Sequence, residues 1–405
     1  MITDEFIKEM PKSDLHVHLD GSLRLNTLIE LAKKDNIELP SYTEEGLREL
    51  VFKDKYGSLG EYLHGFMYTC AVLRKAENLE RVAYELAVDN QQEGVRYIEV
   101  RFAPQLHVNN KQMTMKAVLE SVNKGLARAE KEFNACQEVQ SKEAPPFKYG
   151  IIACAMRMFG QSFSPYYNNL FSVHRYSESM EVIRMGALEL AKAMVKIRDE
   201  QGIPIVGFDL AGQEAGYPAS EFIAAYDYVH KKFIHKTVHA GEAYGAESIF
   251  EAITSLHADR IGHCYYLFDE NKISDPEIKD KKAYIKKLSS YIADQRITIE
   301  VCLTSNMQTN PEIVEIKNHT IKTMLDKRMS LVLCTDNRLI SNTTVSKEVK
   351  LAVDNFQINA KSLKDIVSYG FKRSFYPGDY SERREYVRHV MQFYDKTAKK
   401  HAVVV

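Results

Sequence analysis

Eight short apolar runs recur along the chain and are separated by longer stretches that mix apolar and polar residues. The runs are rich in β-branched residues and are mostly apolar throughout, rather than alternating between apolar and polar positions. This pattern predicts strands that are buried on both faces of a parallel sheet. The runs are DLHVHLD near residue 14, YIEVRF from Tyr97, YGIIACAMR from Tyr149, PIVGFDLAG from Pro204, HKTVHAG from His235, RIGHC from Arg260, ITIEVCL from Ile297 and SLVLCTDN from Ser330.

The stretches between the runs have the spacing of amphipathic helices. Examples are LERVAYELAVDNQQEG and ESIFEAITSLHAD. Strand–helix alternation that is repeated eight times predicts an α/β fold, a (β/α)8 barrel of the TIM type. The length suits a single barrel domain over residues 1–405, and a doubly wound open sheet is the alternative.

Two connections are too long for a plain strand–helix unit. Residues 25–95 hold several helical patterns between the first two strands, and residues 157–203 include a stretch rich in Ser, Tyr and Asn. We therefore expect extra helices after strands one and three. Both insertions follow the carboxyl end of a strand, where barrel active sites form, so they are candidate lids. Residues 378–405 are predicted to form a helical tail.

Composition narrows the class of protein. The 405 residues include 54 Lys and Arg against 55 Asp and Glu, so the basic excess that is typical of nucleic-acid binders is missing. No apolar stretch is long enough to span a bilayer, and the first residues lack a cationic segment followed by an apolar run. We therefore expect a cytoplasmic protein with no nucleic-acid or membrane partner. The sequence does not indicate an oligomeric state.

The six cysteines are scattered along the chain without a CxxC pair. Several of them lie in apolar runs, such as IIACAM and LVLC. They are predicted to be buried free thiols in a reducing compartment.

Polar side chains stand at the carboxyl ends of several predicted strands. His16 and His18 are two residues apart in the first strand, so both side chains point to the same side. His239 ends the fifth strand and Asp336 ends the eighth. Each residue alone has an ordinary explanation, as a core histidine or a turn-capping aspartate. Together, three imidazoles and a carboxylate at one barrel mouth predict a site for zinc or another borderline divalent cation.

Two further polar residues lie beside this set. Glu242 follows His239 in the run HAGE, and His263 ends the sixth strand in RIGHC. Their positions suit general acid or base chemistry next to a metal. The structural alternatives are a surface carboxylate at a helix start and a core histidine bound to a carbonyl group.

Six motifs resemble, in this order, those of the adenosine deaminase family of metal-dependent hydrolases. They are SDLHVHLDGSL, YIEVRFAP, DLAGQE, TVHAGE, RIGHC and LCTDN, and the resemblance runs from about residue 12 to about residue 345. The HxE…PCxxC signature of the zinc cytidine and tRNA-adenosine deaminases is absent. The resemblance implies one zinc ion per chain, held by His16, His18, His239 and Asp336.

The resemblance also implies catalytic roles. Zinc would activate the attacking water, and Asp336 would belong to the catalytic set as one of its ligands. His263 would orient this water and take part in its deprotonation. Glu242 would protonate N1 of the purine as C6 is attacked, which requires that burial raise the pKa of its carboxyl.

Several substrate contacts are implied in the same way. Gly212 matches the glycine whose backbone N–H meets purine N3, and Asp20 matches the acceptor of the ribose 5′-hydroxyl. His18 would lie beside the substrate as well as the metal. Asn337 stands where many family members carry a second aspartate, and its NH2 group would donate a hydrogen bond to N7.

Other residues are expected to support the site from farther away. Leu59, Tyr62 and Phe66 have i, i+3, i+7 spacing and resemble the apolar gate helix over the family's purine pocket, although an ordinary helix core face has the same pattern. Arg101 and Arg157 end strands two and three and are expected to support the charges of the site.

The predicted reaction is hydrolysis of adenosine and 2′-deoxyadenosine to the inosine nucleosides and ammonia, in purine salvage. Another 6-aminopurine compound, such as AMP, adenine or a modified adenine nucleoside, is the alternative substrate. The carboxylate of Asp20 argues against AMP, because it would repel a phosphate by roughly 1–4 kcal/mol. A binding protein that kept the barrel but lost catalysis is the remaining alternative. The partners expected are therefore a small adenine nucleoside and water.

Overall fold

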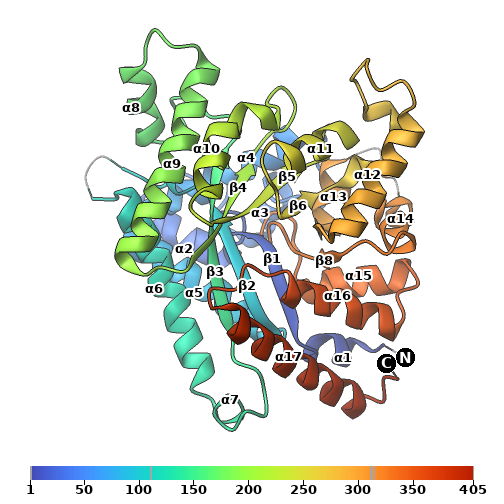
Figure 1. Cartoon of the computed structure of the whole chain (residues 1–405). Coiled ribbons are helices and arrows are strands. Elements are labelled where there is room, and N and C mark those ends of the chain that lie inside the picture. Colours follow the sequence, from blue (N-terminus) through green and yellow to red (C-terminus); the bar gives the residue numbers. More distant parts are fainter. Residues whose placement is uncertain (1, 110–111, 311–312, 314, 405) are drawn as a thin grey trace.

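The computed structural model describes residues 2–109, 112–310, 313 and 315–404. Eight parallel strands lie side by side in chain order (Figure 1). The sheet closes where the segment after the last strand meets the first. The backbone N–H of His18 donates to the Asp336 carbonyl oxygen at 2.7 Å, and the N–H of Asp336 donates to the His16 carbonyl oxygen at 2.8 Å. This closure confirms the predicted barrel and rules out the open sheet. The strands are β1 (Lys12–His18), β2 (Val95–Phe102), β3 (Lys148–Met156), β4 (Ile205–Ala211), β5 (His235–Ala240), β6 (Arg260–His263), β7 (Thr298–Val301) and β8 (Leu331–Leu333).

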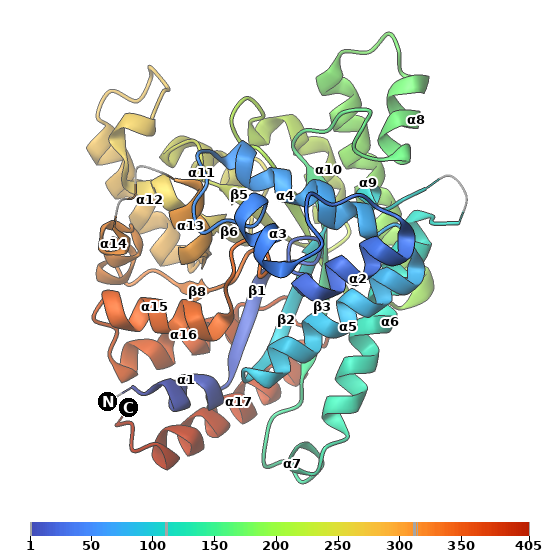
Figure 2. The same cartoon turned by 180° about the vertical axis from the view of Figure 1, so that it is seen from behind.

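Helices surround the strands as an outer layer, which both views of the molecule show (Figures 1 and 2). They form because apolar residues recur at helical spacing. In α6, for example, Val118, Val122 and Leu126 are buried while the opposite face is exposed. The helices that connect successive strands or follow the last one are α5 (Ala76–Gln92), α6 (Met115–Asn134), α9 (Ser179–Gln201), α10 (Ile223–His230), α11 (Ala246–Thr254), α12 (Lys281–Gln295), α14 (Ile321–Asp326), α15 (Val345–Asn355) and α16 (Ala360–Lys372).

Extra helices after strands one and three are confirmed. Three of them precede α5: α2 (Leu25–Asp35), α3 (Glu44–Leu50) and α4 (Leu59–Val72). After β3, α8 (Pro165–Val173) precedes α9. Shorter elements complete the described chain. They are α1 (Asp4–Glu9), α7 (Gln137–Gln140), α13 (Leu303–Thr309), η1 (Pro104–Leu106), η2 (Ala219–Phe222), η3 (Tyr265–Phe268), η4 (Glu270–Lys272) and η5 (Ile316–Asn318).

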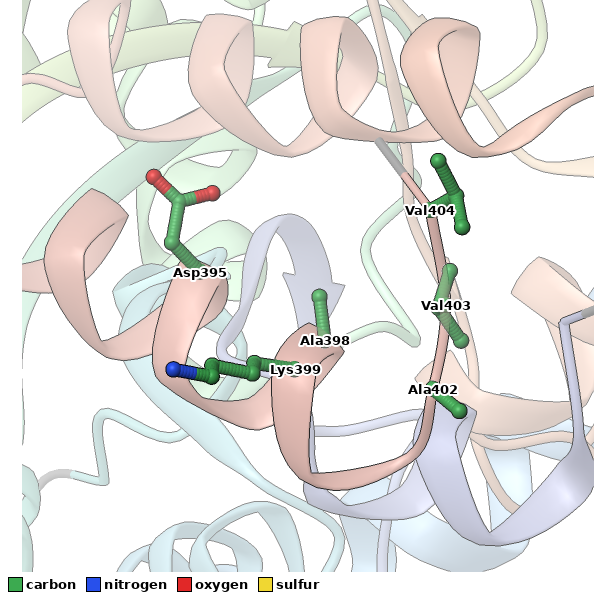
Figure 3. Close-up of a pocket in the computed structure, with 6 residues that line it drawn as sticks. All are labelled: Asp395, Ala398, Lys399, Ala402, Val403 and Val404. Atoms are coloured by element: carbon green, nitrogen blue, oxygen red, sulfur yellow. The ribbon is translucent and has the colours of Figure 1, made fainter.

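The predicted helical tail contains α17 (Tyr380–Lys400), which packs beside α1 at the amino-terminal side of the barrel (Figure 1). A hollow of about 350 Å³ lies at its end (Figure 3). It is lined by Asp395, Ala398, Lys399, Ala402, Val403 and Val404. Because barrel sites form at the opposite, carboxyl ends of the strands, this hollow is not the candidate active site.

All six cysteines are free thiols, as predicted, and five of them are buried. Within the described ranges, none of the helices has both the length and the apolar character that crossing a bilayer requires.

Candidate active site

Four side chains from four strand ends converge at the barrel mouth. His16, His239, His263 and Asp336 are all buried, and one ligand atom from each lies within 4.8 Å of the others. His16 Nε2 is 3.4 Å from Asp336 Oδ1. This nitrogen has no hydrogen-bond partner in the described part of the chain. A buried, unpaired ring nitrogen that faces a carboxylate and other imidazoles fits the environment of a metal ligand.

His18 reaches the same cluster from β1. Its Nε2 lies 3.2 Å from His239 Nε2 and 3.5 Å from Asp336 Oδ1. All four predicted ligands are therefore neighbours. The predicted water-orienting residue, His263, lies as close to the cluster as the ligands do.

The far sides of the His16 and His239 rings are each held by a carboxylate. His16 Nδ1 lies 2.8 Å from Glu300 Oε2, and His239 Nδ1 lies 3.2 Å from Asp209 Oδ1. When the Nδ1–H of a histidine donates to a carboxylate, its Nε2 lone pair is free to bind a metal. The donor set, three imidazoles and one carboxylate with fixed orientations, fits a divalent cation such as zinc.

Glu300 and Asp209 belong to a buried ion-pair network inside the barrel. Arg101 donates to Asp209 Oδ2 at 3.1 Å and to Glu300 Oε2 at 2.9 Å, and Arg260 Nε donates to Glu300 Oε1 at 2.7 Å. Arg260 also pairs with Glu99. Buried carboxylates between guanidinium groups stay ionised, because the arginine charges and the His16 contact hold the pKa of Glu300 well below its usual range despite burial. Arg101 thus supports the charges of the site as expected.

Glu300→Gln is expected to lower both stability and metal affinity. Each contact of the Glu300 carboxylate is with a donor, so an NH2 group there would face donors and leave the arginines partly unpaired. Breaking a buried pair costs about 3–5 kcal/mol, and losing a partner of a ligating histidine weakens metal binding roughly 10–100-fold. Urea unfolding and chelator competition would measure the two effects.

Glu348→Gln is the matched control. Glu348 is also buried, but its partners are neutral: the hydroxyls of Thr304 and Thr343 and the backbone N–H of Thr304. Burial raises the pKa of its carboxyl to about 7. Glutamine resembles the protonated acid, so we expect a small change. Equal losses in the Glu300 and Glu348 variants would mean that the ion-pair network does not brace the metal site.

The backbone adopts a left-handed conformation at two strand ends and so orients the functional side chains there. His263 has φ 64° and Asp336 has φ 60°, which non-glycine residues rarely adopt. Gly241 has φ 76°, and a Cβ there would lie 2.6 Å from Ile249 Cδ1. The glycine of HAGE is therefore required both by its conformation and by close packing.

Glu242 lies on the loop after β5, and Glu214 holds this loop in place. The Glu214 carboxylate accepts hydrogen bonds from the backbone N–H groups of Gly241, Glu242, Ala243 and Tyr244. Burial, with the nearby charges of Asp336 and Glu214, raises the pKa of the Glu242 carboxyl to about 8. Burial is the largest cause, so the direction does not depend on the Asp336 charge that a bound cation would offset. Glu242 can therefore carry a proton near neutral pH.

A chain of hydrogen bonds defines the tautomer of His263. The backbone N–H of Ile321 donates to His319 Nδ1, so a neutral His319 carries its proton on Nε2, 3.2 Å from Asn306 Oδ1. The Asn306 amide is thereby oriented with Nδ2 at 3.1 Å from His263 Nδ1. Burial lowers the pKa of His263 to about 3, and that of His319 likewise to about 3, so both rings are neutral. His263 then carries its proton on Nε2, facing the cluster.

The predicted substrate residues occupy different places around the mouth. Leu59 borders a cavity of about 210 Å³ together with Glu242. The other residues that line this cavity are Ala243, Tyr266, Lys272, Thr309 and Asn310. Gly212 has φ 97°, a conformation that favours glycine. Asp20 is buried, and its Oδ2 lies 3.7 Å from His107 Nε2.

Asn337 and Tyr62 form a pair of their own. Asn337 Nδ2 donates to the Tyr62 hydroxyl at 2.8 Å, and this hydroxyl lies 2.8 Å from Ser341 Oγ. One N–H of Asn337 is therefore used inside the protein, and the proposed contact with N7 stays a prediction. Tyr62 is a buried residue of α4, and Phe66 of the same helix packs against the core.

Some site residues were not singled out from the sequence. Glu300 and Asp209 stand as lone acidic residues within apolar runs, and this pattern indicates buried carboxylates that need partners. Asn306 and His319 lie in loops and short helices without any such pattern. Arg157, which is predicted to support the charges of the site, donates to the backbone carbonyl oxygens of Tyr217 and His239, and its charge acts to lower the pKa of the Glu242 carboxyl against the larger effect of burial.

A (β/α)8 barrel with a buried His/Asp cluster at the carboxyl ends of its strands is typical of metal-dependent hydrolases. Within this class, the sequence model described as Adenosine deaminase matches residues 11–392. The chain belongs to the adenosine deaminase family.

Individual relatives agree with this assignment. The adenosine deaminase of Mycobacterium ulcerans (strain Agy99) is 33% identical over 396 residues, which are 97% of each chain. A probable adenosine deaminase of Dictyostelium discoideum is 33% identical over 92% of this chain, but the match spans only 42% of that longer protein.

Solved structures share the fold. The adenine deaminase of Arthrobacter aurescens superposes with a TM-score of 0.74 at 20% identity, covering 95% of this chain and 99% of that one. An amidohydrolase of Burkhoderia ambifaria with bound Zn has a TM-score of 0.75 at 18% identity, covering 100% of this chain and 96% of that one.

Proposed function

We propose that this protein is a zinc-dependent hydrolase that removes the 6-amino group of adenosine and 2′-deoxyadenosine, giving the inosine nucleosides and ammonia in purine salvage. The observation that carries the proposal is a buried carboxyl, Glu242, beside the His/Asp cluster in a chain of this family. The six free thiols support a reducing, cytoplasmic location.

The metal ligands are His16, His18, His239 and Asp336. Zinc, when bound, supplies an activated water for attack on C6 of the purine. The preference for zinc rests on the imidazole-rich donor set, which this cation favours.

Glu242 holds the proton that N1 needs. Attack on C6 places negative charge on the ring, and a protonated carboxyl at N1 neutralises it. The loop of Glu242 is fixed by Glu214, so this carboxyl is placed before substrate arrives. His263 donates its Nε2–H toward the attacking oxygen and so orients it, a role that its tautomer favours over accepting a proton.

An ultraviolet assay over a panel of compounds tests the proposed function. Adenosine and 2′-deoxyadenosine are expected to be converted to hypoxanthine nucleosides faster than AMP, adenine or N6-modified adenosines. Faster turnover of AMP or adenine would replace the proposed substrate. No turnover of any of them by zinc-loaded protein would favour a binding role.

Asp20→Asn is expected to shift preference from adenosine toward AMP. Asp20 is buried, and its Oδ1 has no hydrogen-bond partner in the described ranges, so it is free to accept the ribose 5′-hydroxyl. Removing its charge lowers the repulsion of a phosphate by roughly 1–4 kcal/mol, which is about fivefold to several hundredfold in the ratio of kcat/KM values.

Steady-state kinetics on adenosine, AMP and 5′-deoxyadenosine measure this shift. The variant should lose little kcat/KM on 5′-deoxyadenosine, which has no 5′-hydroxyl for Asp20 to bind. An unchanged adenosine-to-AMP ratio would place Asp20 away from the 5′ end.

Asn306→Asp is expected to lower kcat by roughly 100-fold, with a smaller change in KM. An aspartate accepts a hydrogen bond from Nδ1–H, so it would move the His263 proton from Nε2 to Nδ1 and remove the donor that faces the attacking water. Asn306→Ala tests the loss of the partner without an added charge, and Asn318→Asp, at an exposed position, controls for that charge. A wild-type kcat in Asn306→Asp would show that the His263 tautomer has no effect on turnover.

A further inference from the structure

A second group of metal-binding side chains lies beside the first, and the two groups share no residue. It consists of Asp20, which follows β1, Cys70 on α4, and His107, which follows η1. All three are buried, and a carboxylate oxygen, the thiol sulfur and a ring nitrogen lie within 4.8 Å of one another. The fold brings these residues together from three separate segments.

Three polar atoms of this group lack partners among the residues that the structure describes. Asp20 Oδ1 and both ring nitrogens of His107 have no hydrogen-bond partner in the described portion of the protein. The shortest contact between the two, from Asp20 Oδ2 to His107 Nε2, is 3.7 Å, which is too long for a hydrogen bond. Buried polar groups are normally paired, so this set of atoms points to a ligand.

The chemistry of the three groups indicates which ligand they fit. An aspartate carboxylate and a cysteine thiolate carry two negative charges, which one divalent cation balances, and a neutral imidazole completes the set. Thiolate and imidazole ligands favour zinc and cadmium over calcium or magnesium. A thiol must lose its proton to bind, and burial with the nearby Asp20 charge raises the pKa of Cys70. Binding of a cation therefore carries the cost of deprotonating this thiol.

We propose that Asp20, Cys70 and His107 form a second site for a thiophilic divalent cation. An ion in this site takes the Asp20 carboxylate, so it competes with a nucleoside whose 5′-hydroxyl uses the same group. Only this competition rests on the proposed function, because cation binding itself does not depend on the reaction.

Cadmium titration of the zinc-loaded full chain tests the site. Wild-type protein is expected to take up one further equivalent of Cd2+, with the ultraviolet charge-transfer absorption of a cadmium–thiolate bond. The first cluster contains no cysteine, so exchange of cadmium for zinc there adds no such band. Cys70→Ser and His107→Leu should each weaken binding of this equivalent by about tenfold or more, and Cys70→Ser should abolish the band. Cys136→Ser, at the one partly exposed cysteine, should still bind the extra equivalent of Cd2+ and show its absorption band.

Two results would contradict the proposal of a second cation site. One is a wild-type protein without the extra equivalent and its band. The other is a band that persists in Cys70→Ser, because the thiolate would then belong to another cysteine. Thermal melts of both variants show whether they fold. Even if adenosine proves not to be a substrate, these readouts remain interpretable.

Inhibition by excess Zn2+ tests the competition. Zinc is expected to raise the KM for adenosine in wild type, and about tenfold more zinc should be needed in His107→Leu. Equal inhibition of both proteins would mean that the second cation does not reach the nucleoside site.

Discussion

The Glu242→Gln protein is expected to keep its metal and its nucleoside affinity but to lose turnover by about 10²–10⁴-fold, the usual contribution of general acid catalysis. Glutamine preserves the shape of the side chain, and its backbone N–H can still donate to Glu214. It has no proton to give to N1 at any pH. The wild-type carboxyl does, because burial raises its pKa to about 8.

The measurements are kcat for adenosine, the Kd of a non-reactive purine nucleoside, and zinc content. Glu277→Gln, at an exposed position, is the control and should match wild type. A Glu242→Gln enzyme within tenfold of the wild-type kcat would mean that the proton comes from another group.

The pH dependence follows from the same carboxyl. Its pKa is raised, so the protonated form is present below about pH 8 and is lost as the pH rises through that value. Turnover that depends on this proton should therefore fall on the alkaline side, and Glu242→Gln should remove that limb of the profile.

The His239→Ala protein is expected to lose both its bound zinc and its activity. His239 Nε2 lies 3.2 Å from His18 Nε2, and its Nδ1 is held by Asp209, so its removal takes away one imidazole ligand that is fixed in orientation. Removal also leaves the buried Asp209 carboxylate with one partner fewer, which adds some loss of stability.

Elemental analysis and the ultraviolet assay, run on the same sample, measure this result. His230→Ala, at an exposed position on α10, is the control for loss of a histidine and should retain zinc. Full zinc in an inactive His239→Ala protein would remove His239 from the ligands. Added zinc that restores activity would show weakened rather than abolished binding.

Both predictions concern residues that could be found from the chain alone. The run HKTVHAGE places His239 at the end of an apolar strand and Glu242 directly after it, and the carboxyl ends of parallel strands meet on one face of a barrel. Local pattern and general topology are therefore sufficient to bring these side chains together. All eight predicted strands are present, because a strand buried on both faces leaves an apolar run that is hard to mistake.

The residues behind the site could not be placed in the same way. Glu300 pairs with Arg101 and Arg260, which stand 199 and 40 positions away, and Asn306 joins His263 to His319. Such partners are set by packing across the barrel, and the spacing of residues along the sequence does not indicate which side chains meet there. A lone acidic residue in an apolar run shows that a buried partner exists, but it does not show which one.

The sequence by itself determined the barrel, the residues at its mouth and the resemblance to the family, because these depend on periodicity and on the order of motifs. The tertiary structure alone decided the protonation state of Glu242, the tautomer of His263 and the grouping of Asp20 with Cys70 and His107. These properties depend on burial and on distances of a few ångströms between segments far apart in the chain. Electrostatic and hydrogen-bond energies change steeply over such distances, so they are fixed only when the chain is folded.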